Sequence, residues 1–433
     1  MEHQFQHEII TKLLTQKLPL ALPEEFLHPY YSGASILNIP ASITANFGAS
    51  PFGRDRLLPE IESRLFPKNY RHVALLLVDG LGYDWLMAYL AKELNSAPEN
   101  RFWSNALADA EISPLTSISP STTATALSTL WTGEPPAAHG ILGYELWLKE
   151  FGILSNMILH TPAASRNTVG SLYNAGMNAT DFVPSKAIAR HLNEYGVKTR
   201  SFQHQSIVNS GLSAMLDEGA ERLPYRTISD MWINFEQALQ AQPQQPSYNW
   251  LYWSEHDSLG HPYGVEDPRV YAEFEQLGLS IINFLRRMRA AGRHDLLLLI
   301  TADHGHLVTP KVPRYTLSNA PEFAQTLAML PSGDNRLPYL YVKPGQEMTM
   351  QTLLRHHWTL DEFALMPSQQ ALQGGLFGPP PFYSRAIDRI GEWLLLPREL
   401  SYLWWSERPN PLLGRHGGLS RTEMLVPLIA LEL

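Results

Sequence analysis

Cysteine is absent from this chain of 433 residues. Its absence excludes disulfide bonds, zinc sites built from thiolates and cysteine nucleophiles. Long apolar runs are absent as well, since no stretch approaches the roughly 20 residues that a membrane helix needs. The first residues, MEHQFQHEII, also lack the basic segment followed by an apolar core that is typical of a secretory signal. We therefore expect a cytoplasmic protein with no membrane partner.

Runs of basic residues are missing too. The chain has 33 Lys and Arg against 42 Asp and Glu, and its formal net charge is −9. No stable complex with a nucleic acid is therefore expected, because such binding depends on clustered positive charge. An acidic protein still accepts an anionic ligand where bound cations reverse the charge locally. The content of 44% hydrophobic and 17% charged residues is typical of a folded globular protein.

Short apolar runs without alternation are the main signal for the fold. Four of them lie at residues 73–78, 250–253, 296–300 and 424–431. Such runs indicate strands that are buried on both faces, as in parallel sheets. Helical patterns lie between them at 83–93, 124–131 and 270–291. Strands that alternate with helices predict an α/β fold, a three-layer sandwich whose mostly parallel central sheet is flanked by helices.

Two segments differ in composition from the rest of the chain. Residues 1–66 predict an N-terminal helix, with Ile9, Ile10, Leu13 and Leu14 on one side, followed by an extended arm rich in Pro, Gly and Ser. We expect residues 67–433 to form the main domain. Within it, residues at about 310–410 are rich in Pro, Gln and aromatics, and we expect a cap-like insertion that helps to shape a ligand pocket.

Polar residues follow the buried runs directly. Asp79, Asp257 and the pair Asp303-His304 come after three of the four predicted strands. Ligands of open α/β sheets bind at the carboxyl ends of the strands, so we expect these side chains to meet at one edge. His261 stands four residues after Asp257, a spacing that puts a carboxylate and an imidazole on one side of a helix.

A third histidine, His416, lies between glycines shortly before the last predicted strand. Three aspartates and three histidines, without cysteine, are ligands that suit Zn²⁺, Mn²⁺ or Fe²⁺. Taken singly, a strand-end Asp is more often a cap or turn residue, and a lone His is more often structural. The joint placement of all six residues favours a metal site.

The segment 118–133 is rich in hydroxyl residues and begins with Ser119-Pro120. It indicates a helix N-terminus, whose free N–H groups and positive dipole suit a phosphate. A hydroxyl at this position that binds a metal ion becomes a nucleophile. The alternative is a helix cap without any chemical role.

Together these segments resemble the alkaline phosphatase superfamily, and its nucleotide pyrophosphatase/phosphodiesterase branch in particular. The similar motifs occur in the family's order from about residue 70 to the C-terminus: Val78-Asp79-Gly80, the nucleophile segment 120–133 with His139-Gly140-Ile141, the D-S-x-G-H motif at 257–261, the A-D-H-G-M motif at 302–306 and the final histidine motif at 415–418. Five motifs in order make the resemblance specific, whereas one alone is weak.

The resemblance implies two divalent metal ions, with Zn²⁺ as the first candidate and Mn²⁺ or Fe²⁺ as alternatives. One ion is held by Asp257, His261 and His416, and the other by Asp79, Asp303, His304 and the nucleophile. Thr123 is the implied nucleophile, because it stands nine residues before Thr132 as in the family. Thr122 is the second choice and is otherwise expected to contact substrate. His139 and His306 are expected to be structural or to support the ligands.

One position departs from the family pattern. The branch has an Asn five residues after the His of the His-Gly-Ile motif, where it contacts a phosphoryl oxygen, and this chain has Tyr144. A phenol donates a hydrogen bond, so Tyr144 is expected to take over this contact in catalysis and substrate binding. Its bulk would also narrow the pocket.

The resemblance thus implies a phosphodiesterase or nucleotide pyrophosphatase that acts on a small phosphate ester, with nucleotides among the candidates. A phosphomonoesterase, a phosphonate hydrolase and a phosphomutase remain as alternatives, and so does a catalytically inactive protein that binds metal or nucleotide. A monoesterase needs a cation near the phosphate, for which Arg166 and Lys186 lie in the relevant stretch. A sulfatase is disfavoured, because its C/S-x-P-x-R motif is not found at the nucleophile position.

Overall fold

A large sheet of seven strands forms the centre of the computed structural model, which describes residues 2–165 and 168–433. The strands lie in the order β2 (Glu111–Thr116), β16 (Leu425–Glu432), β9 (Leu296–Thr301), β1 (His72–Val78), β8 (Ser247–Trp253), β6 (Lys198–His204) and β7 (Glu221–Tyr225). β16 pairs antiparallel with both β2 and β9, and the other strands are parallel to one another. The predicted α/β fold with a mostly parallel sheet is confirmed.

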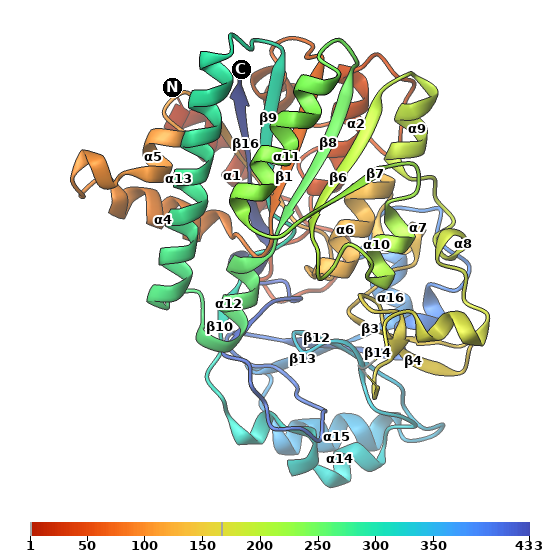
Figure 1. The fold of residues 1–433 in the computed structure, drawn as a ribbon. Helices are drawn as coiled ribbons and strands as arrows, with labels where there is room; N and C mark the ends of the chain where they lie inside the picture. Colours follow the sequence, from red (N-terminus) through yellow and green to blue (C-terminus); the bar gives the residue numbers. More distant parts are fainter. Residues whose placement is uncertain (1, 166–167) are drawn as a thin grey trace.

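The four apolar runs of the sequence lie in β1, β8, β9 and β16, at the middle of this sheet. Every residue of β1, β8 and β9 is buried, which explains why these strands show no alternation. Helices pack against the sheet in two groups, and the helices of each group contact one another (Figure 1). One group consists of α4 (Tyr83–Glu93), α5 (Phe102–Ala106), α11 (Ile228–Ala241), α12 (Glu255–Tyr263) and α13 (Pro268–Ala290). The other group consists of α2 (Ile39–Asn46), α6 (Thr123–Thr132), α7 (Pro136–His139), α9 (Ile188–Glu194) and α10 (Gly211–Leu216).

A second sheet, antiparallel throughout, lies at the end of the molecule that is lower in Figure 1. Its order is β13 (Phe363–Pro367), β14 (Trp393–Pro397), β12 (Leu337–Leu340), β11 (Ser332–Asp334), β3 (Glu145–Leu148), β4 (Ile153–Asn156) and β5 (Thr161–Pro162). The predicted insertion therefore does not stand alone, because three of these strands come from residues 145–162. The helices α14 (Pro321–Gln325) and α15 (Glu347–His357) contribute to a hydrophobic cluster separate from the main core, whereas the buried residues of α16 (Ser368–Gln373) belong to the main core.

The N-terminal 66 residues differ in part from the prediction. The expected helix is present as α1 (Glu2–Thr15), but the expected extended arm contains the helices α2 and α3 (Pro59–Leu65). Pro40 and Pro59 lie in the first turn of these helices, where proline is tolerated, so they do not prevent helix formation. Ile36, Ile43 and Ile61 are fully buried in the main core, so this segment is part of the domain. None of the helices described is both long enough and apolar enough to cross a bilayer.

Candidate active site

The topology gathers the predicted site residues at one edge of the first sheet. Asp79 follows β1, Asp257 and His261 lie on α12 directly after β8, and Asp303-His304 follow β9. β16 runs in the opposite direction, so it begins at the edge where the parallel strands end. His416, which precedes β16, therefore lies at that edge as well, held by the short pairing of β15 (Gly414–Arg415) with β10 (Leu307–Val308).

The first cluster consists of Asp79, Asp303 and His304, all buried, with ligand atoms within 4.8 Å of one another. Asp303 accepts hydrogen bonds through Oδ1 from the N–H groups of Gly80 (3.1 Å) and His304 (3.0 Å). Asp79 accepts one through Oδ2 from the hydroxyl of Tyr252.

The other oxygens of the two carboxylates, Asp79 Oδ1 and Asp303 Oδ2, are buried and accept no hydrogen bond from the described residues. They lie 3.5 and 3.4 Å from Nε2 of His304. A buried carboxylate oxygen without a donor is costly unless a cation compensates it. The donor set therefore fits a metal ion.

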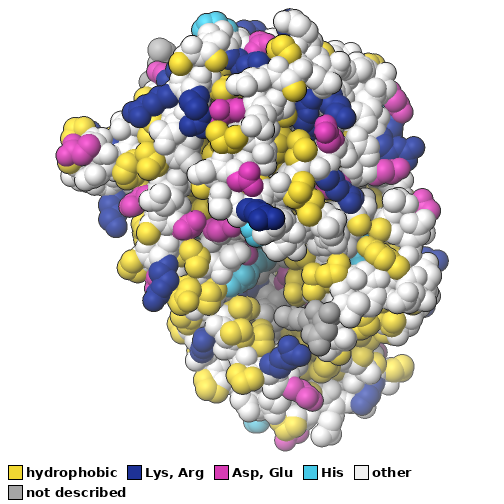
Figure 2. All heavy atoms as spheres, in the orientation of Figure 1, with side chains coloured by type: hydrophobic (Ala, Val, Ile, Leu, Met, Phe, Trp, Pro, Cys, Tyr) yellow, Lys and Arg dark blue, Asp and Glu magenta, His cyan; other side chains and the backbone are white. Residues whose placement is uncertain are grey.

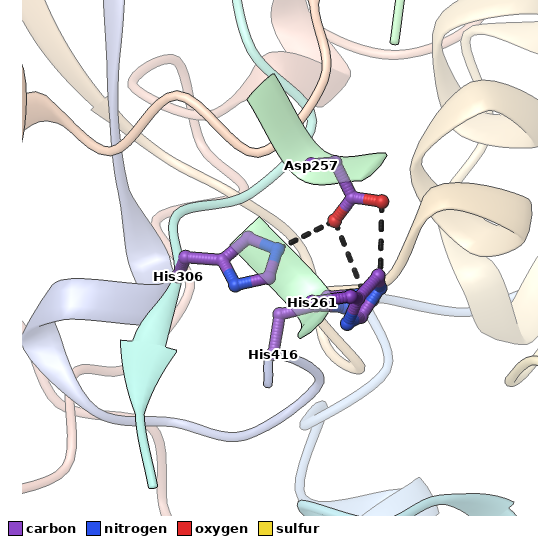
Figure 3. Close-up of side chains that lie close together, drawn as sticks. All are labelled: Asp257, His261, His306 and His416. Carbon is purple, nitrogen blue, oxygen red and sulfur yellow. Dashed lines mark hydrogen bonds and ion pairs between the residues drawn. The ribbon is translucent and has the colours of Figure 1, made fainter. Parts of the chain in front are cut away.

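The second cluster consists of Asp257, His261, His306 and His416 (Figure 3). Asp257 lies 3.4 Å from His261 Nε2 through Oδ2, and 3.7 Å from His416 Nε2 through Oδ1. His306 is closer, since its Nε2 lies 2.6 Å from Oδ1 of Asp257. The rings of His304 and His416 stack at 3.6 Å between centroids, so the two clusters adjoin.

Three of the histidines share one hydrogen-bond arrangement. His304, His261 and His416 each donate through Nδ1 to a backbone carbonyl, of Gly305 (3.0 Å), Gly414 (3.0 Å) and Ser121 (3.1 Å) respectively. A carbonyl only accepts, so the proton is on Nδ1 and the lone pair of Nε2 faces the carboxylates. This second contact is typical of metal-binding histidines, whose orientation it fixes.

Charges in the site are strongly coupled. Burial, followed by the negative charges of Asp303 and Asp257, raises the pKa of Asp79 well above its usual range. Burial would raise the pKa of Asp257 too, but the charge of His261 and the hydrogen bond of His306 hold it well below its usual range. Burial, followed by the charge of His304, holds the pKa of His416 well below its usual range. Neutral imidazoles and crowded carboxylates are the forms that bind a cation.

The two candidate nucleophiles have different partners. Thr123 is the first residue of α6, and its Oγ1 lies 3.3 Å from Nε2 of His304 in the first cluster. Thr122 is the residue before the helix, and its hydroxyl donates instead to Oδ1 of Asp334 at 2.9 Å. Only the hydroxyl of Thr123 thus adjoins a predicted metal ligand.

Asp334 is a residue of this site that the sequence did not reveal. Besides Thr122, it accepts a hydrogen bond from the backbone N–H of Tyr144 at 3.3 Å, and burial raises its pKa to about 7. Asp334 comes from β11 in the second sheet, and no motif marks it. The side chain of Tyr144 is half-buried, and its contact with substrate stays a prediction.

The remaining predicted residues are placed as follows. His139 is buried away from both clusters, between Thr129 and the N–H of Ile141. His306 supports Asp257 through the hydrogen bond to Oδ1. In the sequence, only its place two residues after His304 indicated that it lies near the site. Lys186 pairs with Glu194, and Arg166 lies outside the described residues.

A hollow lies over this edge of the sheet, and histidine side chains are visible in it between the parts that hold the two sheets (Figure 2). A cavity of about 60 Å³ adjoins Thr123 and Tyr252. Its walls come from residues 123–131, 158, 203–217 and 250–252. Residues at about 310–410, which we expected to help shape a ligand pocket, do not line this cavity.

The fold is similar to those of solved structures in the alkaline phosphatase superfamily. Mouse ectonucleotide pyrophosphatase/phosphodiesterase 5 has a TM-score of 0.60 and 17% identity, with 83% of this chain and 87% of that chain covered. An inactive form of the same mouse protein has been solved in complex with AMP, with a TM-score of 0.59 and 16% identity over the same shares of both chains. Phosphonoacetate hydrolase from Sinorhizobium meliloti 1021, in complex with phosphonoformate, has a TM-score of 0.58 and 18% identity, with 83% and 90% covered.

These structures share the fold of the chain, with its mostly parallel central sheet flanked by helices. Residues 73–357 match the family described as type I phosphodiesterase/nucleotide pyrophosphatase, and the chain belongs to this family, which is part of the alkaline phosphatase superfamily. Comparison with curated protein sequences finds no significant relative. Family membership supports a metal-dependent phosphoester hydrolase, with a phosphodiesterase, a pyrophosphatase and a phosphonate hydrolase as the candidate activities.

Proposed function

We propose that the protein hydrolyses phosphodiesters through a covalent intermediate on Thr123. The observation that carries this proposal is the contact of the Thr123 hydroxyl with His304, at the start of α6 and beside a cavity. The first N–H groups of a helix have no partner within the helix and are available to an anionic phosphoryl group. A nucleophile, an anion-binding backbone and a substrate cavity therefore lie together.

The residues of the chain suggest two in-line steps. The Oγ of Thr123 first attacks phosphorus and displaces one alcohol, which leaves with a proton, so that phosphothreonine carries the other substituent. Water then attacks the same phosphorus, the bond to Thr123 breaks, and a monoester is released. The N–H groups at the start of α6 donate to the phosphoryl oxygens while negative charge develops on them.

Two metal ions fit the clusters, one with Asp79, Asp303, His304 and Thr123, the other with Asp257, His261 and His416. When bound, such ions lower the pKa of a coordinated hydroxyl and stabilise charge on the oxygens of a displacement at phosphorus. Carboxylate and imidazole ligands suit Zn²⁺ first, with Mn²⁺ and Fe²⁺ as alternatives. His306 would orient Asp257 from outside through the hydrogen bond at 2.6 Å.

A diester is favoured over a monoester by the charges around Thr123. In the part of the chain that the structure describes, the cavity beside Thr123 is lined by no Lys or Arg. A dianionic monoester needs more compensating positive charge than a monoanionic diester does. Tyr144 shares the partner Asp334 with Thr122, and we propose that its phenol makes the contact that Asn makes in the family.

The test is turnover of bis-4-nitrophenyl phosphate and 4-nitrophenyl phosphate by metal-stripped protein to which Zn²⁺ or Mn²⁺ is added back. We expect metal-dependent release of 4-nitrophenolate with a higher kcat/KM for the diester. A higher kcat/KM for the monoester would assign a phosphatase instead. If neither ester is cleaved by protein with two bound ions, while phosphonoacetate is, a phosphonate hydrolase replaces the proposal.

A further inference from the structure

Asp334 lies where three segments of the site meet. Its Oδ1 accepts a hydrogen bond from the hydroxyl of Thr122 at 2.9 Å, and its Oδ2 accepts one from the backbone N–H of Tyr144 at 3.3 Å. One buried carboxylate therefore joins the residue before the proposed nucleophile to the residue that stands in place of the family's Asn. Because Asp334 belongs to β11, this connection also joins the second sheet to α6.

The third segment is the loop that carries His416, and it is shaped around the same carboxylate. At Gly417 a Cβ would lie 2.8 Å from the Cβ of Asp334, which is too close for any side chain. Gly417 also has a φ of 109°, which glycine adopts without strain. Asp334 itself belongs to neither cluster of candidate metal ligands. Its contacts therefore hold segments of the site together.

The bond from Thr122 to Asp334 completes the anchoring of the start of α6. Ser121 is fixed from the loop after His416, since its hydroxyl donates to the carbonyl of Gly418 at 2.8 Å. Thr122 is fixed from the second sheet. It has extended backbone angles, with φ −139° and ψ 145°, and Thr123 begins the helix directly after it. The direction of the Thr123 side chain therefore depends on how Thr122 is held.

We propose that Asp334 is a positioning residue for the reaction, which sets the place of the Thr123 hydroxyl relative to Tyr144 by holding Thr122 and Tyr144 on one carboxylate. The inference rests on the proposed function, since it uses Thr123 as nucleophile. A displacement of about 1 Å in a reacting group lowers turnover by up to about 100-fold. Because ground-state binding does not require this alignment, Asp334 acts on kcat more than on KM.

Two substitutions of Asp334 separate positioning from the loss of a buried carboxylate. In Asp334→Asn the amide oxygen accepts from the N–H of Tyr144 and the amide nitrogen donates to the hydroxyl oxygen of Thr122, so both connections are kept without the charge. Asp334→Ala removes both connections. We expect Asp334→Ala to lower kcat for bis-4-nitrophenyl phosphate by about 10-fold or more, with KM changed by less than about 3-fold. Asp334→Asn is expected to recover most of this loss.

Equal losses of kcat in Asp334→Asn and Asp334→Ala, or an effect confined to KM, would overturn the inference. If Asp334→Ala does not fold, Thr122→Val takes its place, because it keeps the shape of the side chain and removes one of the two connections. This variant is expected to lower kcat by about 3-fold or more with little change in KM. An unchanged kcat in Thr122→Val would then overturn the inference.

The control is Asn335, the next residue of the chain. Its side chain donates to the carbonyl of Leu403 at 2.9 Å. Asn335→Ala therefore loses a hydrogen bond directly after β11 without removing the connections to Thr122 and Tyr144, and we expect it to keep the kcat of the parent protein. If its kcat falls as far as that of Asp334→Ala, disturbance of β11 alone explains the loss and the inference fails.

Vanadate binding keeps the inference separate from the proposed function. Bound vanadate takes up a five-coordinate form that is similar to the transition state at phosphorus, whereas phosphate is similar to the ground state. By titration calorimetry of Zn²⁺-loaded protein, we expect Asp334→Ala to weaken vanadate binding by about 10-fold or more and phosphate binding by less than about 3-fold. If the parent protein cleaves no ester, the proposed function fails, and a selective loss of vanadate affinity would still uphold the positioning role. Equal losses of both affinities would overturn it.

Discussion

Two adjacent threonines at the start of α6 hold their hydroxyl groups against different partners. Thr123 faces His304 at 3.3 Å, and Thr122 donates to Asp334 at 2.9 Å. The two side chains diverge because Thr122 has extended backbone angles while Thr123 is the first helical residue. The hydroxyl of Thr122 therefore holds the start of α6 against β11, and that of Thr123 faces the first cluster.

We predict from this divergence that Thr123→Ala lowers kcat by about 10³-fold or more, because no neighbouring hydroxyl replaces the nucleophile. Thr122→Ala should lower kcat much less but reduce the free energy of unfolding by about 1–3 kcal/mol, since Asp334 loses a buried donor. Steady-state kinetics and urea unfolding of the two variants check this. A larger loss of kcat in Thr122→Ala would move the nucleophile to Thr122.

His306 gives a prediction about metal retention. Its Nε2 lies 2.6 Å from Asp257, and Gly414 leaves room for the ring, because a Cβ there would lie 2.7 Å from Nδ1. His306→Met, which restores the residue of the family motif, removes the hydrogen bond to Asp257. We expect metal affinity to fall by about 10–100-fold, measured by competition with a chelator.

The control for this prediction is His256, the neighbour of Asp257 in sequence. Its ring packs edge-on against Trp85, with centroids 4.7 Å apart, and belongs to neither cluster. His256→Phe should therefore keep the metal affinity of the parent protein. Equal loss in both variants would show that His306 acts through packing alone.

At the scale of elements, α6 and the turn after α7 are joined by His139. Its Nδ1 accepts from the N–H of Ile141 at 3.1 Å, so the proton is on Nε2, which donates to Thr129 at 3.0 Å. Protonation of Nδ1 would break the bond to Ile141. Burial, followed by the charge of Arg389, lowers the pKa of His139 to about 3.

The sign of the resulting pH effect follows from the lowered pKa. In the unfolded chain His139 binds a proton near pH 6.5, whereas in the folded chain it does so only near pH 3. The free energy of unfolding therefore falls as the pH drops between these two values. The slope from this group approaches about 1.4 kcal/mol per pH unit. His139→Asn, which keeps an acceptor for Ile141, should be less stable at pH 7 but lose less on going to pH 5. Unfolding by urea at both pH values measures this, and equal slopes would refute it.

The central strands of the first sheet could be predicted because strands buried on both faces consist of apolar runs without alternation. β1, β8 and β9 are buried throughout and mostly apolar, and the residue that follows each apolar run is polar. The second sheet was not predictable in this way. Its strands have two to five residues, and β3 and β11 pair at Gly333 and Glu145 although they lie far apart in the chain. Pairing over such separations depends on tertiary packing, which local patterns do not record.

The same contrast holds for the site. The candidate ligands Asp79, Asp257, Asp303 and His416 could be inferred from strand ends and glycine-flanked motifs. Tyr252 could not, because it lies inside an apolar run, and only the pairing of β8 with β1 places its hydroxyl against Asp79. Asp334 was missed for a similar reason, since it reaches Thr122 from the other sheet. Residues that support ligands are set by register and packing, not by a motif.

At the scale of the molecule, a buried ion pair joins the second sheet to the loop that carries His416. Arg336, in the turn between β11 and β12, donates to Glu423 through Nε (3.0 Å) and Nη2 (2.8 Å), and neither side chain is exposed. Glu423 also accepts from the N–H of Gly418 at 2.9 Å and from the hydroxyl of Ser420 at 2.6 Å. The loop after His416 is thus fixed by a contact with the part of the chain that supplies Asp334.

Loss of Arg336 should therefore unfold the molecule more easily than loss of an exposed pair. We expect Arg336→Met to reduce the free energy of unfolding by about 3–5 kcal/mol, because Glu423 stays buried without its cation. Arg190→Met breaks the exposed pair with Glu218 and should cost less than about 1 kcal/mol. The double variant Arg336→Met/Glu423→Gln should recover part of the loss, since no charge is then left alone. Urea unfolding measures all three, and equal costs in Arg336→Met and Arg190→Met would show that the two sheets are held together without this pair.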